Sequence, residues 1–162
     1  MTDIEKIDKI VEHKQGIITA TSKLGHALIK AGEVRLGREL IANGYIHDDS
    51  KFHGIEFLHL YNGNPNKDAF MLAMIQHQSV NMHHPEYWGA IQEMHRLYVA
   101  EMVCDWKTRS SEFATDLQGY ITNVAMDRFK FTARDKVHEE IAYFKSLLCD
   151  TPFTALRPES GG

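Results

Sequence analysis

The sequence predicts an all-α protein built as a single helical bundle. Apolar residues recur at the three- and four-residue spacing of helices through most of the chain, and no hairpin dipeptide joins two alternating apolar runs. At 162 residues the chain has the length of one domain and can bury a core. We therefore expect about five to seven helices over residues 1–150, followed by a C-terminal tail over residues 151–162.

Two helices are expected at the start of the chain. The first begins at a capping box formed by Thr2 and Glu5 and ends at the Ala-Gly pair of residues 31–32. The second is expected over residues 33–43. Gly44 is its predicted C-terminal stop, because glycine readily adopts the left-handed conformation in which many helices end.

The remaining helices are separated by breaks in the apolar pattern. Residues 61–68, YNGNPNKD, form one break, and helix resumes near residue 67 until Pro85 stops or kinks it. Three more helical stretches follow, over residues 91–109, 116–131 and 133–148. Thr132 and Asp135 imitate a capping box in front of the last of these.

The composition excludes several classes of protein. A formal net charge of −4 argues against long nucleic acid as a partner, because nucleic acid binds to a basic face. No apolar run approaches the roughly 20 residues of a membrane span, so no membrane partner is expected. Cys104 and Cys149 form neither a zinc-type pair nor a disulfide framework, which favours a reducing cytoplasm.

Ten histidines are the unusual feature of the composition, and their positions indicate a metal site. His47 and Asp48 are adjacent, and imidazole and carboxylate are common ligands of zinc, iron and manganese. His77, Asn81 and His84 lie at positions i, i+4 and i+7, so they share one face if a helix continues through them. A plainer interpretation is that histidines at a helix end complement its dipole, which fits a lone histidine better than a group.

Further ligands could come from two other helices. Asp105 lies mid-helix among apolar neighbours, where it either faces solvent or binds a partner, because an unpartnered buried carboxylate is strongly unfavourable. Glu101, one turn earlier, could support a site from behind. His13 and His26 both lie on the first helix but 13 residues apart (26 − 13), so they cannot serve the same ion. Spacing alone does not choose between them.

Together these pieces resemble the HD-domain phosphohydrolase superfamily, and within it a small family found in phages and bacteria. The shared pattern is a histidine on an early helix, an adjacent His-Asp pair and a distant helical aspartate. It is carried by EHK at residues 12–14, HDDSKF at residues 47–52, HQSVNMHHPEYW at residues 77–88 and EMVCDW at residues 101–106. Glu56 follows the second piece, and Arg134 is a fainter match. The first histidine of the pattern falls on His13, which favours it over His26.

The resemblance implies a metal centre. Four side chains would bind one divalent ion: His13, His47, Asp48 and Asp105. Relatives with added histidines hold two ions, so a second ion is plausible at His77 and either His83 or His84, with Asp48 as the bridge. The expected cofactor is therefore one or two divalent transition-metal ions, drawn from zinc, manganese, iron, cobalt and nickel.

The resemblance also implies a function. The protein would be a metal-dependent phosphohydrolase acting on a small phosphate ester, in particular a nucleotide, in the cytoplasm of a bacterium or a phage-infected host. Such an ion lowers the pKa of a bound water from about 15.7 toward about 7 and draws charge from a phosphoryl oxygen. Lys51 would face a substrate phosphate, and Asn81 would orient a ligand or a substrate oxygen. Whichever of His83 and His84 does not bind metal would protonate the leaving group.

Other functions stay open on the sequence alone. Two irons in the same ligands would suit an oxygenase that cleaves carbon bonds with dioxygen. A phage accessory or anti-defence protein could bind a nucleotide there without turnover. A purely structural ion would make the fold depend on metal. The oligomeric state is also open, a homodimer being the commonest case.

The remaining aromatic, sulfur-containing and imidazole side chains are interpreted as packing or surface residues. Tyr87, Trp88 and Trp106 could stack on a base, but large rings more often fill helical cores. The methionines, including Met71 and Met94, are interpreted as core filler. The histidines interpreted as surface or supporting residues are His53, His59, His95 and His138.

Overall fold

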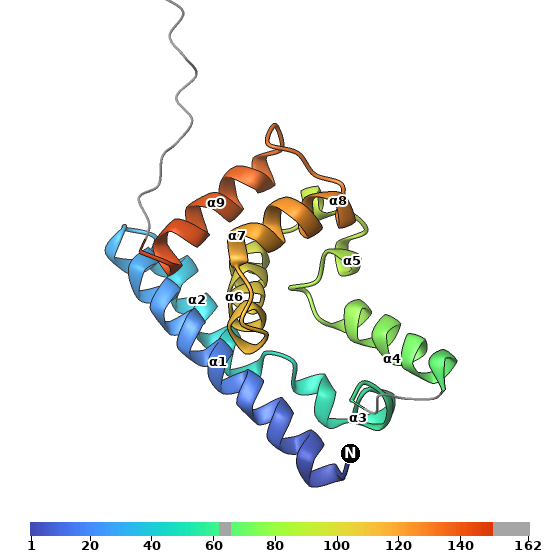
Figure 1. Ribbon diagram of the computed structural model, residues 1–162. Coiled ribbons are helices and arrows are strands. Elements are labelled where there is room, and N and C mark those ends of the chain that lie inside the picture. The colour runs from blue at the N-terminus through green and yellow to red at the C-terminus, as the bar shows by residue number, and fades with distance from the viewer. Residues whose placement is uncertain (62–65, 151–162) are drawn as a thin grey trace, which may run out of the picture.

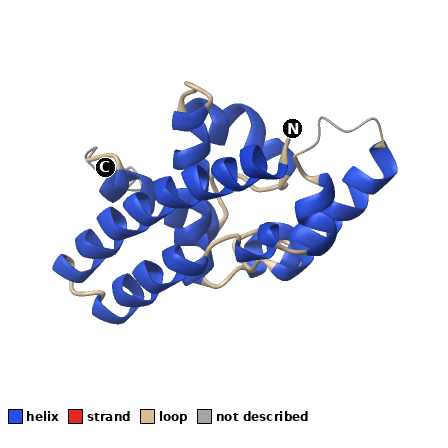
Figure 2. Ribbon diagram, turned by 90° about the horizontal axis from the view of Figure 1, so that it is seen from below, coloured by secondary structure: helices blue, strands red, loops and turns tan. Residues whose placement is uncertain are grey.

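Helices form all the regular structure in residues 1–61 and 66–150, the ranges that the computed structural model describes (Figure 1, Figure 2). No strand occurs in these ranges, which confirms the all-α prediction. Five helices are longer than ten residues: α1 (Asp3–Lys30), α2 (Val34–Ile46), α4 (Lys67–Val80), α6 (Arg96–Glu112) and α9 (Lys136–Leu148). The short helical segments between them are η1 (Asp49–Phe52), α3 (Gly54–His59), α5 (Pro85–Trp88), η2 (Ile91–Glu93), α7 (Leu117–Tyr120), η3 (Ile121–Ala125) and α8 (Met126–Arg128).

Two predicted segments fall partly or wholly outside the described ranges. These are the C-terminal tail, residues 151–162, and part of the predicted break, residues 62–65. Within the described part of the chain, no helix is long and apolar enough to cross a membrane.

α1 and α2 lie side by side with their backbones in close contact (Figure 1). A Cβ atom at Gly37 would lie 2.4 Å from the carbonyl oxygen of Gly25 on α1. A Cβ atom at Gly44 would lie 2.0 Å from Oγ1 of Thr21, also on α1. The prediction that Gly44 ends the second helix is therefore wrong. α2 continues to Ile46, and Gly44 lies inside it because α1 leaves no room for a side chain.

α6 is the central helix of the fold (Figure 1). It packs against α1, α2 and α9, and ten of its 17 residues are buried, so most of its circumference is covered. Core residues contributed by these four helices include Leu24, Leu28, Leu40, Val99, Val103, Ile141 and Phe144. Because α6 is covered on several sides, its acidic residues Glu101 and Asp105 are buried and need partners.

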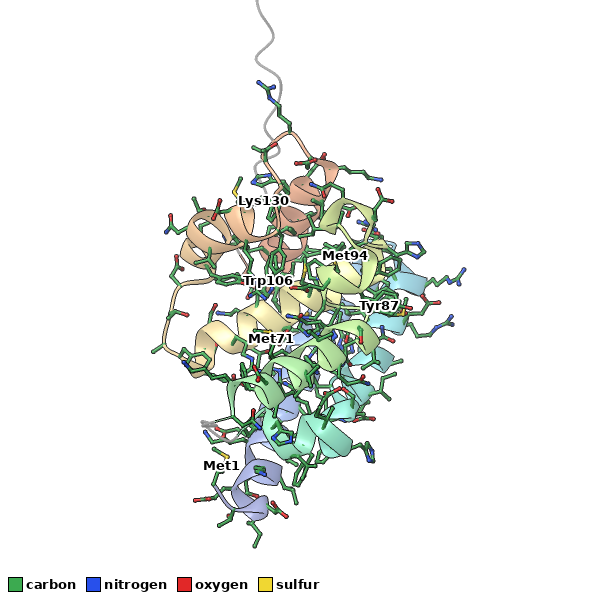
Figure 3. The ribbon with its side chains drawn as sticks, turned by 90° about the vertical axis from the view of Figure 1, so that its right-hand side faces the viewer. Met1, Met71, Tyr87, Met94, Trp106 and Lys130 are labelled. Carbon is green, nitrogen blue, oxygen red and sulfur yellow. The ribbon has the colours of Figure 1, made fainter. Side chains whose placement is uncertain are left out.

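The two tryptophans pack within the protein. Trp106, labelled in Figure 3, lies 5.3 Å from the ring of Tyr120 and 6.0 Å from the nearly parallel ring of Phe129. Trp88 donates its indole N–H to the carbonyl oxygen of Met82 at 2.8 Å. The interpretation of both tryptophans as packing residues is therefore confirmed.

α4 packs on α3 and α5 and buries only a narrow stripe, formed by Ala73 and His77. Met71, on the same helix, has 57% of its surface exposed, whereas Met94 is buried in the core (Figure 3). The interpretation as core filler is confirmed for Met94 and is wrong for Met71. The narrow buried stripe of α4 directs His77 toward the rest of the bundle.

Two helices start later than predicted. α6 begins at Arg96, because residues 91–93 form the separate 3-10 turn η2. α9 begins at Lys136, with Asp135 as its N-cap residue. The backbone N–H of Thr132 donates to the carboxylate of Asp135 at 2.7 Å, so this pair closes a turn that precedes the helix.

Candidate metal centre

Seven side chains from five separate parts of the sequence meet inside the bundle. They come from α1, the end of α2, α4, the turn between α4 and α5, and α6: His13, His47, Asp48, His77, His83, His84 and Asp105. All are buried except His84, which is half-buried. The sequence predicted this set with a choice between His83 and His84, and the structure brings both of them to the cluster.

The first group of ligands consists of His13, His47, Asp48 and Asp105. His13 Nε2 lies 3.1 Å from Asp105 Oδ1 and 3.8 Å from Asp48 Oδ2. His47 Nε2 lies 3.5 Å from Asp48 Oδ2 and 3.7 Å from Asp105 Oδ1. Ligands held about 2.0 to 2.2 Å from one ion are themselves about 3 to 3.5 Å apart. His13, His47 and Asp48 are therefore close enough to one another to hold a single cation, and Asp105 lies within 3.1 to 3.7 Å of both imidazoles.

The second group consists of Asp48, His77, His83 and His84. His77 Nε2 lies 3.4 Å and His83 Nε2 lies 3.3 Å from Asp48 Oδ1. His84 Nε2 lies 3.0 Å from His77 Nε2. Asp48 thus turns one carboxylate oxygen toward each group, which is the arrangement of a bridging ligand. His83 Nε2 is also 3.8 Å from Asp105 Oδ2, so the two groups adjoin.

The backbone at Asp48 lets two consecutive residues face the same centre. α2 ends at Ile46, and Asp48 adopts the left-handed conformation, with φ 57° and ψ 22°. The chain turns sharply there into η1, and the side chains of both His47 and Asp48 lie in the cluster. A non-glycine residue in this conformation costs about 1 to 2 kcal/mol. Such strain is concentrated at functional sites.

In four of the five imidazoles of the cluster, a carboxylate binds the ring nitrogen that faces away from the centre. The pairs, each between Nδ1 and a glutamate oxygen, are His13–Glu112 at 2.6 Å, His47–Glu101 at 2.8 Å, His77–Glu56 at 2.9 Å and His83–Glu101 at 3.3 Å. A ring that donates its Nδ1–H to a carboxylate presents the lone pair of Nε2 on its other side. The glutamates therefore orient these four imidazoles with the Nε2 atom that could bind a metal ion facing the centre.

Five inward-facing atoms of the cluster lack hydrogen-bond partners among the described residues. These buried atoms are His13 Nε2, His47 Nε2, Asp48 Oδ1, His83 Nε2 and Asp105 Oδ1. Buried polar atoms are nearly always paired, and a group of unpaired ones requires an explanation such as a bound ion. Nitrogen and carboxylate oxygen donors that converge on one point fit divalent transition-metal ions.

The carboxylates at the centre are held in their charged form. Burial alone would raise the pKa of Asp48, but the charges of His47 and Lys51 hold it well below its usual value. Burial would likewise raise the pKa of Asp105, and the imidazoles of His13 and His47 instead hold it well below the usual value. Both aspartates therefore offer full negative charge to a cation.

The imidazoles respond to these charges in opposite ways. Burial lowers the pKa of His47, but the charge of Asp48 and a hydrogen bond to Glu101 help to raise it to about 10. Burial and the nearby charge of His83 lower the pKa of His84 to about 3. The carboxylates thus attract positive charge strongly enough to hold a proton on His47. A metal ion that binds this ring competes with that proton.

Residues 2–146 match the model of the family described as "Family of unknown function (DUF5662)". The chain belongs to that family. All seven side chains of the centre lie within the DUF5662 match. No curated protein and no solved structure matches the chain.

In this DUF5662 protein, Asn81 stabilises the position of His77 and of its hydrogen-bond partner Glu56. α4 ends at Val80, so the predicted continuous helix through Asn81 is not formed, and Asn81 is the C-cap residue. Its side-chain amide donates to the carbonyl oxygen of His77 at 2.8 Å and to Oγ of Ser50 at 2.9 Å. Ser50 in turn donates to Glu56 at 2.8 Å. Asn81 therefore supports the hydrogen bond between Glu56 and His77.

Lys51 is buried beside the centre. Its Nζ atom lies 2.6 Å from Asp48 Oδ2 and 5.7 Å from the centre of the Tyr61 ring. Burial would lower its pKa, but the charge of Asp48 raises it, so the ammonium group stays charged. Its contact with a substrate phosphate stays a prediction.

Three histidines outside the cluster are exposed at the surface of the protein. His26 is exposed, and its Nδ1 atom lies 2.6 Å from the carbonyl oxygen of Ser22. The structure therefore brings His13, and not His26, to the centre. His53 and His95 are also exposed.

Sequence reasoning assigned no role to Glu56 or Glu112. Glu112 has a signal that could have found it, because Glu101, Asp105 and Glu112 follow one another at spacings of four and seven residues on one face of α6. Glu56 reaches His77 across the turn that contains η1 and α3. Its position depends on the conformation of that turn, for which the sequence offers no periodic signal.

Proposed function

We propose that this protein is a metal-dependent phosphohydrolase of the HD-domain type, acting on a small phosphate ester and in particular on a nucleotide. The observation that carries the proposal is the position of Asp48, whose two carboxylate oxygens face two adjacent groups of imidazoles. The imidazoles are oriented from outside by glutamates. Such a set suits two divalent ions side by side, an arrangement used for phosphate ester hydrolysis.

Each group of ligands offers four protein side chains, and this number bears on the choice of metal. Four ligands close a tetrahedral zinc site, whereas an ion that accepts five or six ligands keeps positions for water and substrate. Among the expected metals we therefore favour manganese, iron, cobalt or nickel over zinc. Because His83 and His84 both belong to the second group, we propose both as ligands, and neither remains to protonate the leaving group.

When bound, divalent ions supply a water whose pKa is lowered toward about 7 and draw charge from a phosphoryl oxygen. The other contributions come from the chain itself. Glu101 and its counterparts hold the imidazoles with Nε2 facing inward. Lys51 offsets negative charge on a phosphate oxygen. Burial of the cluster excludes bulk water, which strengthens each of these electrostatic interactions.

Phosphate release by the metal-loaded protein tests the proposal. We expect protein loaded with manganese or cobalt to release phosphate, or open the ring, in a panel of nucleoside mono-, di-, tri- and cyclic phosphates. His47→Ala should abolish both turnover and stable metal binding, because it removes a ligand from the first group. His26→Ala is the matched control, since it removes an exposed histidine from the same protein and should keep both properties. A protein with two ions per chain that transforms no member of the panel contradicts the proposal.

Two other outcomes of these experiments would assign a different function. Two bound irons, visible-light absorption and consumption of dioxygen would indicate the oxygenase, because imidazole and carboxylate ligands suit iron equally well. Nucleotide binding that survives His47→Ala, with no phosphate released, would indicate a binding protein without catalysis.

A further inference from the structure

We propose that Arg109 is a phosphate-binding residue of this centre, and that its guanidinium and the ammonium of Lys51 together bind an anionic phosphate group of the substrate. The inference rests on the proposed function and deepens it. Arg109 lies on α6 one turn after the ligand Asp105, so it shares that face of the helix. Lys51 has the corresponding place three residues after the ligand Asp48.

A shared hydrogen-bond partner links Arg109 to the candidate ligands. The guanidinium donates to Glu112 at 3.3 Å, and Glu112 also binds Nδ1 of His13 at 2.6 Å. One carboxylate therefore connects Arg109 to His13, and the helix places Arg109 on the same face as Asp105. Burial acts to lower the pKa of Arg109, but the charges of Asp105 and Glu112 act to raise it, so the guanidinium stays charged.

Arg109 has hydrogen-bond donors to spare. Its Nη1 atom donates to Oε2 of Glu112 at 3.3 Å, and 41% of its side chain is exposed. A guanidinium carries five N–H donors in a planar fork that matches two oxygens of one phosphate. Lys51, by contrast, is buried with its ammonium group on Asp48. Arg109 is therefore the better placed of the two to receive a phosphate from solvent.

The balance of charge supports a role for Arg109 in binding an anion. Five carboxylates surround the centre, in Asp48, Asp105, Glu56, Glu101 and Glu112. Two divalent ions would contribute four positive charges, and Lys51 and Arg109 contribute two more, which leaves one net positive charge. Without Arg109 the formal charges sum to zero, which weakens the attraction of the centre for an anion. The substrate class that fits is an ester with an accessible, negatively charged phosphate.

A purely structural role for Arg109 makes a different prediction. Glu112 also accepts a hydrogen bond from Nδ1 of His13 at 2.6 Å, so Arg109 could act only by steadying Glu112 and, through it, His13. In that case, loss of the guanidinium would lower metal content and kcat together. If Arg109 binds phosphate, loss of the guanidinium instead raises KM and weakens the binding of inorganic phosphate, while the bound metal stays the same.

The test measures binding of inorganic phosphate to the full-length, metal-loaded protein by calorimetry. We expect Arg109→Gln to weaken this binding about 10- to 100-fold, the effect of losing charge-assisted hydrogen bonds. Metal content should not change, and Arg109→Lys should restore part of the affinity as a point charge without the fork. Lys107→Gln is the matched control, because it removes the same charge from α6 two residues earlier, on another face of the helix.

Three results would overturn the inference. These are unchanged phosphate affinity in Arg109→Gln, an equal loss of affinity in Lys107→Gln, and a loss of bound metal in Arg109→Gln that accounts for the weaker binding. Phosphate binding is measured apart from turnover, so a failure of the proposed function can be told from a failure of this inference. If only the proposed function is wrong, the protein binds phosphate through Arg109 but hydrolyses no ester.

Discussion

The carboxylate of Asp48 presents Oδ1 to His77 and His83 and Oδ2 to His13 and His47. It holds this position from a left-handed backbone conformation, with φ 57°. Asparagine adopts that conformation more readily than most other residues. An asparagine at this position would therefore keep the turn of the chain and remove only the charge that both groups of ligands share.

We expect Asp48→Asn to reduce the metal content from two ions per chain to one or none, because a neutral amide cannot bridge two cations. Metal analysis of the purified variant measures this, and far-UV circular dichroism reports whether the helices are kept. Asp49→Asn is the control, since Asp49 is an exposed neighbour paired with Lys14 and belongs to neither group. Full metal content in Asp48→Asn would show that Asp48 is not the shared ligand.

Glu101 accepts from both His47 and His83, and also from the side-chain amide of Asn43 at 3.0 Å. We expect Glu101→Gln to weaken metal binding about 10- to 100-fold, as is usual when a carboxylate that orients a ligand is lost. Competition with a chelator of known affinity measures the change. Glu139→Gln, at an exposed position on α9, should leave the affinity as it is. Equal affinities in the two variants would contradict an orienting role for Glu101.

The candidate metal ligands were easier to predict from the sequence than the residues that hold them in place. His47 and Asp48 are adjacent, and Asp105 is a carboxylate in a helix that would otherwise be apolar at that point, so each can be recognised locally. Choosing His13 over His26 required the resemblance to a known pattern. Glu56 could not be assigned, because its contact with His77 exists only after α3 and α4 have packed together.

The contact between α1 and α2 fixes the position of the His47–Asp48 pair. Gly37 and Gly44 let α2 approach α1 more closely than any side chain would allow. His13 lies on α1, and the His47–Asp48 pair directly follows α2. The spacing of the first group of ligands therefore depends on glycines that take no part in binding.

We expect Gly44→Ala to destabilise the protein by about 1 to 3 kcal/mol, the usual effect of overpacking a buried contact. The added Cβ atom would meet Thr21 Oγ1 at 2.0 Å, so α2 must move away from α1. Chemical denaturation of the metal-free protein measures the free energy of unfolding. Adding Thr21→Ala to the Gly44→Ala variant removes Oγ1, the atom nearest to the new Cβ, and should restore part of the lost stability. A Gly44→Ala variant as stable as the wild type would show that this contact is not tight.

Gly44 also shows why the end of α2 could not be predicted from the sequence. Glycine both ends helices and permits close packing inside them, and the sequence does not distinguish the two uses. The long helices were predictable because their apolar spacing persists over several turns. The turn from Asn81 to Pro85 was not, since its conformation is set by contacts of Asn81 with Ser50 and of His84 with His77.

For the whole molecule, the apolar core and the metal centre make separate contributions to stability. The core joins α1, α2, α6 and α9 and includes no residue of either group of ligands. We expect chelation to leave the protein folded and to lower the melting temperature by about 5 to 11 °C for each ion that was bound at 100 times its dissociation constant. Thermal unfolding followed by circular dichroism measures the shift, and Asp48→Asn should show a smaller one. Complete unfolding by a chelator at room temperature would instead indicate a structural metal.

We propose that seven side chains from five parts of the chain hold two ions that share Asp48. Anomalous diffraction at metal absorption edges, from crystals grown with the metal that the protein carries after purification, tests it most directly. We expect two ions per chain, both bound to Asp48, one with His13, His47 and Asp105 and the other with His77, His83 and His84. No ion within coordinating distance of Asp48, or one ion closed by four protein ligands, would contradict it.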